Sequence, residues 1–179
     1  MTLLRHLVAI LALPFAVVVL VPRWILTAAT PGDTRWPAGA SLPAAGGRAL
    51  GGLLFLAGFA LFAWCVALFA RVGRGTLAPW DPTRRLVVVG PYRHVRNPMI
   101  TGVAAMLAGE ALAFGSRYLA YWLGAFALIN HLYFVLVEEP GLAKRFGAGY
   151  GEYRAAVPRW VPRLRPWSGA SSSDDDTRR

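Results

Sequence analysis

Cysteine and acidic residues are scarce in this chain, and their scarcity excludes several classes of protein. The single cysteine, Cys65, lies inside an apolar run and has no second cysteine with which to pair. A disulfide framework is therefore excluded, and no Cys/His spacing typical of a metal site is present. The glycine pattern Gly73-x-Gly75 lacks the βαβ context of a soluble nucleotide-binding fold.

Apolar residues are abundant instead. The chain of 179 residues is 56% hydrophobic and 16% charged, with a mean hydropathy of +0.45. A soluble domain of this length cannot bury so much apolar surface, so the composition predicts a membrane protein. The net charge is +10, but the basic residues lie mainly between or after the apolar runs, as in loops that face an anionic leaflet. Nucleic acid is therefore not an expected partner.

Four apolar runs are candidates for transmembrane helices, at residues 3–28, 49–70, 99–115 and 118–137. The first run also permits a secretory signal peptide with Arg5 as its charged region, but it is too long for a typical signal core, and we expect a retained helix. Residues 29–47 read as a loop rich in Pro, Gly and Ala. Gly47 and Gly51 stand four residues apart, and Gly51, Gly52 and Gly58 add small faces to the second run, which suits close helix contact in lipid.

The short connection at Arg117 joins the third and fourth runs into an antiparallel helical hairpin. Beyond Pro140, apolar residues recur at helical spacing and form a narrow stripe: Leu142, Phe146, Tyr150, Tyr153 and Val157. This pattern predicts an amphipathic helix on the membrane surface. The predicted fold is all-α, an integral membrane bundle of about four transmembrane helices with a hairpin and a cytoplasmic C-terminal helix. Its regions are 1–70, 71–165 and a tail, 166–179, that reads as disordered from Ser171.

The basic residues predict the orientation of this bundle. Four of the 19 Lys and Arg residues fall on the far side of the membrane or at its interface: Arg23, Arg35, Arg48 and Arg117. The other 15 fall on the side of the two termini. By the positive-inside rule, both termini and the polar segment 71–97 are cytoplasmic. We expect a bacterial inner membrane location. The sequence indicates no oligomeric state.

Polar residues beside membrane spans are functional candidates, because charge is costly in a bilayer. One group is the turn 90–98, a second is Glu138 with Glu139, and a third is the buried set Glu110, Asn130 and His131. The hairpin brings the first two groups to one membrane face, where an arginine can bind a carboxylate through two hydrogen bonds. A purely structural reading remains open, in which the arginines and glutamates only tie helix ends together.

One ordered set of residues carries a family resemblance: Gly90-Pro91-Tyr92-Arg93-His94-Val95-Arg96-Asn97-Pro98, Gly102, Glu138-Glu139, Phe146-Gly147, Tyr150, Tyr153 and Pro158-Arg159. This set resembles the membrane methyltransferases of the isoprenylcysteine carboxyl methyltransferase and phospholipid N-methyltransferase group. The segment 75–82 resembles their bacterial members. Two positions depart from the pattern: Asn97 stands where many relatives have His, and Ile100 where they have Tyr. The second departure puts a prenylcysteine substrate in doubt.

The resemblance implies an S-adenosylmethionine-dependent methyltransferase whose lipophilic acceptor enters from the bilayer. It implies catalytic roles for Glu139 and Arg96 and a cofactor site of twelve residues: Gly90, Tyr92, Arg93, His94, Arg96, Asn97, Pro98, Gly102, Glu138, Glu139, Tyr150 and Tyr153. Glu138 and Glu139 would hold the amino acid end or the ribose, and Glu110 and His131 are candidate bases. The acceptor atom stays open. The alternatives are a sterol-type reductase using NADPH and a non-catalytic membrane protein.

Overall fold

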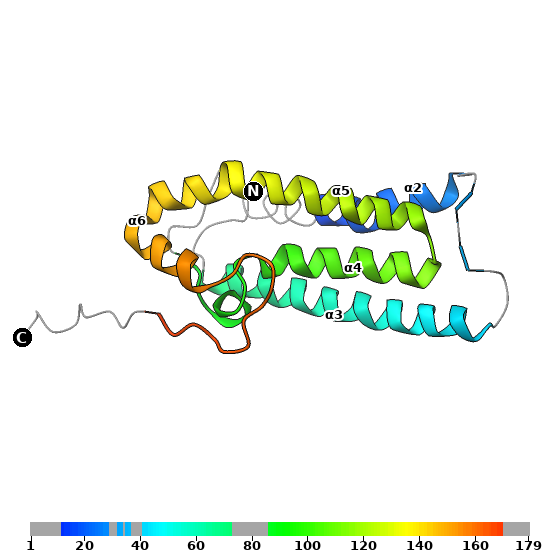
Figure 1. Cartoon of the computed structure of the whole chain (residues 1–179), viewed down its shortest axis with the longest axis horizontal. Helices are drawn as coiled ribbons and strands as arrows, with labels where there is room; N and C mark the ends of the chain where they lie inside the picture. The colour runs from blue at the N-terminus through cyan, green and yellow to red at the C-terminus, as the bar shows by residue number, and fades with distance from the viewer. Residues whose placement is uncertain (1–11, 29–31, 34, 37–40, 73–85, 170–179) are drawn as a thin grey trace, which may run out of the picture.

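A computed structural model describes residues 12–28, 32–33, 35–36, 41–72 and 86–169, and every regular element in these ranges is helical (Figure 1). The first helix, Ala12–Thr27, contains a π-helical turn, η1 (Ala16–Leu20), followed by α2 (Val21–Thr27). Then come α3 (Leu42–Val72), a 3-10 turn η2 (Gly90–Arg93), α4 (Pro98–Phe114), α5 (Arg117–Tyr133), a π-helical turn η3 (Phe134–Glu138) and α6 (Glu139–Ala156). The all-helical prediction is confirmed.

Four apolar helices run side by side in alternating directions and form an elongated bundle (Figure 1). Two of them, Leu42–Phe69 and Arg117–Ala156, are long and apolar enough to cross a bilayer, whereas Ala12–Thr27 and Pro98–Phe114 are shorter. The predicted number of helices is confirmed, while crossing by the two shorter ones stays a prediction. The first helix packs in the core through Val18, and Trp122 of α5 donates a 3.0 Å hydrogen bond to the carbonyl oxygen of Val17. Retention of this helix in the mature protein stays a prediction.

The start of α3 corrects the sequence prediction. Residues 42–47 were expected to belong to a loop because of Pro43 and the neighbouring glycines, yet α3 begins at Leu42. Proline is favoured in the first turn of a helix, where its missing N–H would have no helical partner anyway. Pro43 therefore marks the beginning of the helix, not its interruption.

Glycines hold α3 and α4 at close range. A Cβ on Gly58 would lie 2.6 Å from the carbonyl oxygen of Gly102, and a Cβ on Gly51 would lie 2.5 Å from that of Gly109. The two backbones therefore touch with no side chain between them, which increases van der Waals contact where no hydrophobic effect drives association. The expected small face of α3 is confirmed at Gly51 and Gly58, whereas Gly47 contacts Trp36.

The hairpin between α4 and α5 is built as predicted. Gly115 ends α4 in the left-handed conformation with a φ of 64°, and Ser116 caps α5 by accepting a hydrogen bond from the N–H of Leu119. Asp33 joins the preceding loop to this turn, since its carboxylate accepts hydrogen bonds from the hydroxyl of Ser116 and the N–H of Arg117. Burial alone would raise the pKa of Asp33, but the hydrogen bond and charge of Arg35, together with the bonds from Ser116 and Arg117, hold it below the ordinary value of 3.8.

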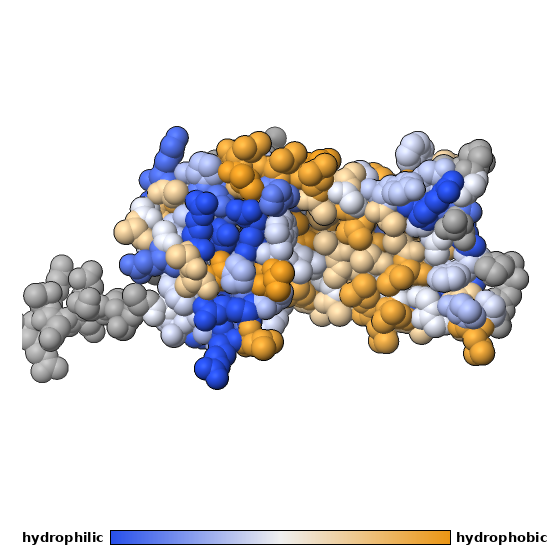
Figure 2. All heavy atoms as spheres, viewed as in Figure 1, coloured by the Kyte–Doolittle hydropathy of each residue, from blue (hydrophilic) through white to orange (hydrophobic). Residues whose placement is uncertain are grey.

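Apolar side chains cover the outside of the bundle between two polar ends (Figure 2). Leu53 and Leu56 on α3 are 65% and 63% exposed, and Ile129 on α5 is 61% exposed. Such surface requires lipid as its solvent. The helical stretch Arg117–Ala156 has 40 residues, about twice the number that a helix needs to cross the hydrocarbon. Its apolar part ends at Val137, so Glu138 and the polar residues after it lie outside the membrane-spanning segment.

Helix α6 carries the predicted apolar stripe on one face. Tyr150, Tyr153 and Val157 are buried together and pack against Leu142 and Phe146. The helix is kinked at Gly147, whose φ of 53° and ψ of −129° are not helical. A residue with a side chain disfavours this conformation, so the glycine allows α6 to fold back over the end of the bundle.

Candidate active site

The turn at residues 90–98, which we call the arginine turn, leads into α4 in a conformation fixed by its glycine and prolines. Gly90 has a φ of 56°, which is open to glycine without strain. Pro98 occupies the first turn of α4, and Tyr92 is buried in the turn, with its ring 5.4 Å from that of Phe69 on α3. The turn thus projects Arg96 from a rigid support at the polar end of the bundle.

Glu139 is the centre of the polar cluster at this end. Its side chain is 5% exposed, and Arg96 Nη1 lies 2.6 Å from its Oε1. Arg159 binds both carboxylate oxygens, with Nε 2.6 Å from Oε1 and Nη2 2.9 Å from Oε2. Arg154 lies 3.5 Å from Oε2 at the exposed edge. The prediction that the arginine turn and the double glutamate meet at one membrane face is confirmed.

The three guanidinium groups control the charge of Glu139. Burial alone would raise the pKa of this carboxyl, but hydrogen bonds from Arg159 and the charges of Arg96, Arg159 and Arg154 outweigh it and hold the pKa below its ordinary range. Glu139 is therefore ionised at neutral pH. A buried carboxylate with this many cationic partners is locked in place rather than free to exchange with solvent.

The direct ion pair between Arg96 and Glu139 leaves no space for a ligand between these two side chains. Two polar groups, one in the arginine turn and one in the double glutamate, nevertheless have no hydrogen-bond partner among the described residues. Arg96 Nε is buried and has no hydrogen-bond acceptor within the described part of the chain. Glu138 is half-buried, and it accepts no hydrogen bond from any described residue. The cluster therefore offers a ligand one donor, Arg96 Nε, and one carboxyl group, that of Glu138, whose pKa is raised to about 7 by burial and by the adjacent Glu139.

Tyr150 and Tyr153 close the cluster from the α6 side. The hydroxyl of Tyr150 lies 3.5 Å from Arg96 Nη1, and Tyr153 donates a 2.7 Å hydrogen bond to the carbonyl oxygen of Tyr92. Burial raises the pKa of Tyr153 well above its ordinary range, so its hydroxyl stays protonated and continues to donate. Tyr153 thus ties α6 to the arginine turn, and Tyr150 contacts the arginine itself.

A segment that we call the strap, residues 157–169, follows α6 and crosses the arginine turn. Backbone hydrogen bonds join Arg96 N to Pro158 O at 2.9 Å, Arg163 N to His94 O at 3.0 Å, and Trp167 N to Arg93 O at 2.9 Å. Trp167 also packs on Tyr153, with ring centroids 5.5 Å apart. The tail predicted to begin at residue 166 therefore begins too early, because Trp167 is part of this packing. Residues 170–179 lie outside the described residues.

The strap separates the predicted site residues into two groups. Arg93 donates from Nε to the carbonyl oxygen of Trp167 at 2.6 Å, and His94 Nδ1 lies 2.8 Å from that of Arg163. Gly90 and Gly102 face α3, where added Cβ atoms would meet Leu68 and Phe62. The structure thus brings Arg96, Glu139 and Tyr150 together. Asn97 and Pro98 follow Arg96 in the chain, and Glu138 precedes Glu139. The other four residues make their contacts elsewhere: Gly90, Arg93, His94 and Gly102.

The candidate bases lie apart from the cluster. His131 on α5 accepts a 3.1 Å hydrogen bond from Trp160 of the strap, which is a structural link. Asn130 donates to the carbonyl oxygen of Phe126 within its own helix. Glu110 lies in α4, and its Oε2 is buried with no hydrogen-bond partner in the described part of the chain.

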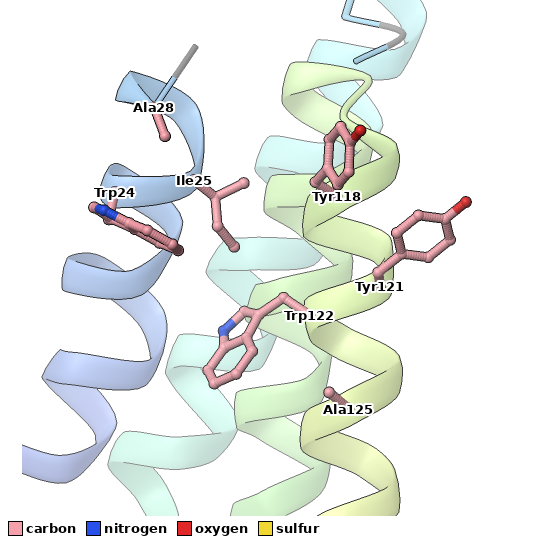
Figure 3. A pocket seen from close by; sticks show the side chains of 7 residues that line it. All are labelled: Trp24, Ile25, Ala28, Tyr118, Tyr121, Trp122 and Ala125. Atoms are coloured by element: carbon pink, nitrogen blue, oxygen red, sulfur yellow. The ribbon is translucent and has the colours of Figure 1, made fainter. Parts of the chain in front are cut away.

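Two hollows lie elsewhere on the molecule. An apolar hollow of about 280 Å³ lies between α2 and α5 at the end opposite Glu139, lined by aromatic side chains that include Trp24, Tyr121 and Trp122 (Figure 3). A groove of about 430 Å³ lies between α3, the arginine turn and the strap. Neither is lined by Glu138 or Glu139, so the polar cluster is distinct from both.

Sequence reasoning missed Arg159 and Arg154 as site residues. Arg159 stood in the Pro158-Arg159 pair that carried part of the resemblance, and this pair could have marked it. Arg154 follows Tyr150 by four positions on α6, which places it beside the same face of the helix.

The chain matches the model of a known family. The family described as phospholipid methyltransferase matches residues 47–149, which run from α3 through the arginine turn and the hairpin into α6. No curated protein and no solved structure matches the chain.

Proposed function

The chain belongs to the phospholipid methyltransferase family, and we propose that the cluster around Glu139 binds the S-adenosylmethionine that this membrane methyltransferase uses. The family establishes an S-adenosylmethionine-dependent enzyme of the membrane that methylates a lipid acceptor. The positions of the cofactor, the acceptor and the catalytic groups are our proposal. The observation that carries it is a buried arginine N–H, Arg96 Nε, which has no acceptor in the described residues and belongs to the guanidinium that binds Glu139; the half-buried Glu138 directly precedes Glu139 in the chain.

The residues at this end fit the polar groups of the cofactor. Its amino acid end carries an ammonium and a carboxylate, and its ribose carries hydroxyls. Arg96 Nε has no acceptor in the described residues and suits the carboxylate. Glu138 suits the ammonium or the ribose hydroxyls, because a carboxylate accepts from both. Asn97, between Arg96 and Pro98, adds an amide that both donates and accepts.

The two glutamates have different tasks in this proposal. Glu139 accepts three hydrogen bonds from Arg96 and Arg159 and pairs with Arg154, so most of its acceptor capacity is already used within the protein. We therefore assign it the positioning of Arg96, whose guanidinium it fixes through a charge-assisted hydrogen bond. Glu138 is the carboxylate that faces the cofactor. This division follows the geometry of a helix, in which adjacent side chains diverge by about 100°.

S-adenosylmethionine supplies, when bound, a methyl group on a positively charged sulfur. The tyrosines of α6 and the strap exclude water from this end of the bundle, and Arg96 fixes the orientation of the amino acid end. As the methyl group leaves, the sulfur would become a neutral thioether and the positive charge would spread over the methyl group and the acceptor, and a dry site favours this dispersal of charge. Fixed orientation supplies a large part of the rate acceleration.

The acceptor in this proposal is a lipid that reaches the site from within the bilayer. The family model points to a phospholipid, and the exposed apolar faces of α3 and α5 are continuous with the hydrocarbon. An amine headgroup must lose its proton before it accepts the methyl group, whereas a carboxylate acceptor needs no base. We place the site on the cytoplasmic face of a bacterial inner membrane, because most basic residues gather at this end.

Calorimetry on the purified protein tests the assignment of the cofactor. S-adenosylhomocysteine should bind saturably to the wild type, and its affinity should fall about tenfold or more in Arg96→Ala, since a charge-assisted hydrogen bond contributes about 1.5–3 kcal/mol. NADPH serves as the control ligand. Binding of NADPH alone would indicate the reductase alternative, and failure of both ligands to bind would favour a non-catalytic protein.

A further inference from the structure

The groove between α3, the arginine turn and the strap has a mixed lining that the proposed methyl transfer does not use. Its walls are apolar, with Leu61 and Trp64 from α3 on one side and Pro162 and Pro166 from the strap on the other. Arg93, His94 and Thr101 line it as well. The groove thus combines an apolar slot with one guanidinium, at the polar end of the bundle.

Among the residues that the structure describes, the cations around the groove have no acidic partners. In the described ranges, ion pairs form only with Asp33 and Glu139, and neither involves Arg93, Arg163 or Arg165. The strap contains no Asp or Glu between residues 157 and 169. Arg93 and Arg163 donate to backbone carbonyls but keep further N–H groups for an anion. This local excess of positive charge is complementary to a phosphate.

The rim of the groove is built to lie in lipid. Leu164, which stands between Arg163 and Arg165, is 97% exposed, and Val161, two residues before Arg163, is 75% exposed. Trp64 on α3 is 55% exposed, which is typical of an aromatic side chain at a membrane–water interface. Exposed leucine and valine next to arginine suit the boundary between acyl chains and headgroups, where both kinds of side chain are solvated.

We propose that this groove binds one anionic phospholipid of the leaflet that contains the active site. Its phosphate contacts Arg93, with Arg163 and Arg165 of the strap close by, and its acyl chains lie along Leu61 and Trp64. A soluble anion would gain nothing from the apolar walls, so the lining favours a lipid over free phosphate. The bound lipid fixes the strap against α3, and the strap also carries Arg159 to Glu139.

Native mass spectrometry of the detergent-purified protein tests this site. Phosphatidylglycerol should be retained as a single adduct about tenfold more strongly than phosphatidylcholine, and glycerol phosphate, which has the headgroup without chains, should not be retained. Arg93→Gln should reduce phosphatidylglycerol retention about tenfold, and Arg165→Gln should reduce it several-fold, as expected for lost charge-assisted contacts. The matched control is Lys144→Gln, an exposed cation of α6 away from the groove, which should retain the lipid as the wild type does.

The results separate this proposal from the cofactor site. Arg165→Gln should keep the wild-type affinity for S-adenosylhomocysteine, because Arg165 lies outside the Glu139 cluster, and its melting temperature shows whether the fold is intact. Equal retention of both lipids would overturn the proposal, as would equal loss in the Lys144→Gln control. Retention of glycerol phosphate at the same strength would show a free-anion site and would also overturn it.

Discussion

Arg159 of the strap binds both carboxylate oxygens of Glu139: its Nε lies 2.6 Å from Oε1 and its Nη2 lies 2.9 Å from Oε2. The family match ends at residue 149, so the strap completes the cluster from beyond the matched region. It does so by folding back over the arginine turn, where its backbone pairs with that of Arg93, His94 and Arg96. The conformation of the C-terminal segment and the position of Arg96 are therefore coupled through one carboxylate.

The first prediction concerns this grip. Arg159→Ala should lower the free energy of unfolding in detergent by about 2 kcal/mol, because Glu139 loses two charge-assisted hydrogen bonds. Arg159→Lys should recover part of the loss, since an ammonium keeps the charge but not the fork geometry. Thermal unfolding followed by tryptophan fluorescence measures both. Lys144→Ala, an exposed change on α6, should shift stability by less than about 0.5 kcal/mol, and an equal loss there would contradict the role of Arg159.

The contact between α3 and α4 gives a second prediction. Gly58→Ala places a Cβ within 2.6 Å of the Gly102 carbonyl oxygen, so the helices must separate, at a cost of about 1–3 kcal/mol. Gly52→Ala is the matched control, because a Cβ there meets nothing within 4 Å. That control should be neutral or slightly stabilising, since alanine favours a helix over glycine. Equal melting temperatures for the two variants would show that the glycine contact is unimportant.

The helices were largely predictable because each is an apolar run bounded by a residue with a local effect. Gly115 ends α4 and Pro98 begins it, within one residue of the predicted limits. The start of α3 was wrong because the same residue, Pro43, can either break a helix or open one, and only its position relative to the turn decides which. The kink at Gly147 could not be located among three nearby glycines without knowing how α6 packs.

A third prediction follows from the lowered pKa of Asp33. A carboxyl whose pKa falls on folding stabilises the protein above its ordinary value of 3.8 and loses that contribution as the pH falls through the folded-state pKa. Asp33→Asn should therefore be less stable than the wild type at neutral pH, and the difference should shrink in acid. The difference is measured as the melting temperatures of the wild type and of Asp33→Asn from neutral pH down into acid. A difference that stays constant with pH would contradict the assigned ionisation.

The fourth prediction concerns orientation. Single cysteines at the two ends of the bundle report it: Leu42→Cys at the start of α3, where the native side chain is 89% exposed, and Ala155→Cys, exposed on α6. Cys65 is fully buried and should not react. In spheroplasts a membrane-impermeant maleimide should label Leu42→Cys, and it should label Ala155→Cys only after the membrane is opened. The reverse pattern would place the active site on the outer face.

The site was predictable in part, and the reason lies in what sequence can specify. The hairpin forces Arg96 and Glu139 to one face, and this meeting follows from two helices and a short turn. Which glutamate is free and which is locked depends on Arg159, whose approach is set by the path of the strap. The same path draws Arg93 and His94 to the groove on the other side. No periodicity encodes that path, because backbone hydrogen bonds fix it.

The division of labour between the two glutamates is the central claim, and calorimetric titration of S-adenosylhomocysteine into Glu138→Gln tests it most directly. We expect the affinity to fall about tenfold with an unchanged melting temperature, because Glu138 contacts no described residue by hydrogen bond and its charge serves the ligand. Glu152→Gln, an exposed change on α6, should bind as the wild type does. Wild-type affinity in Glu138→Gln would contradict the account.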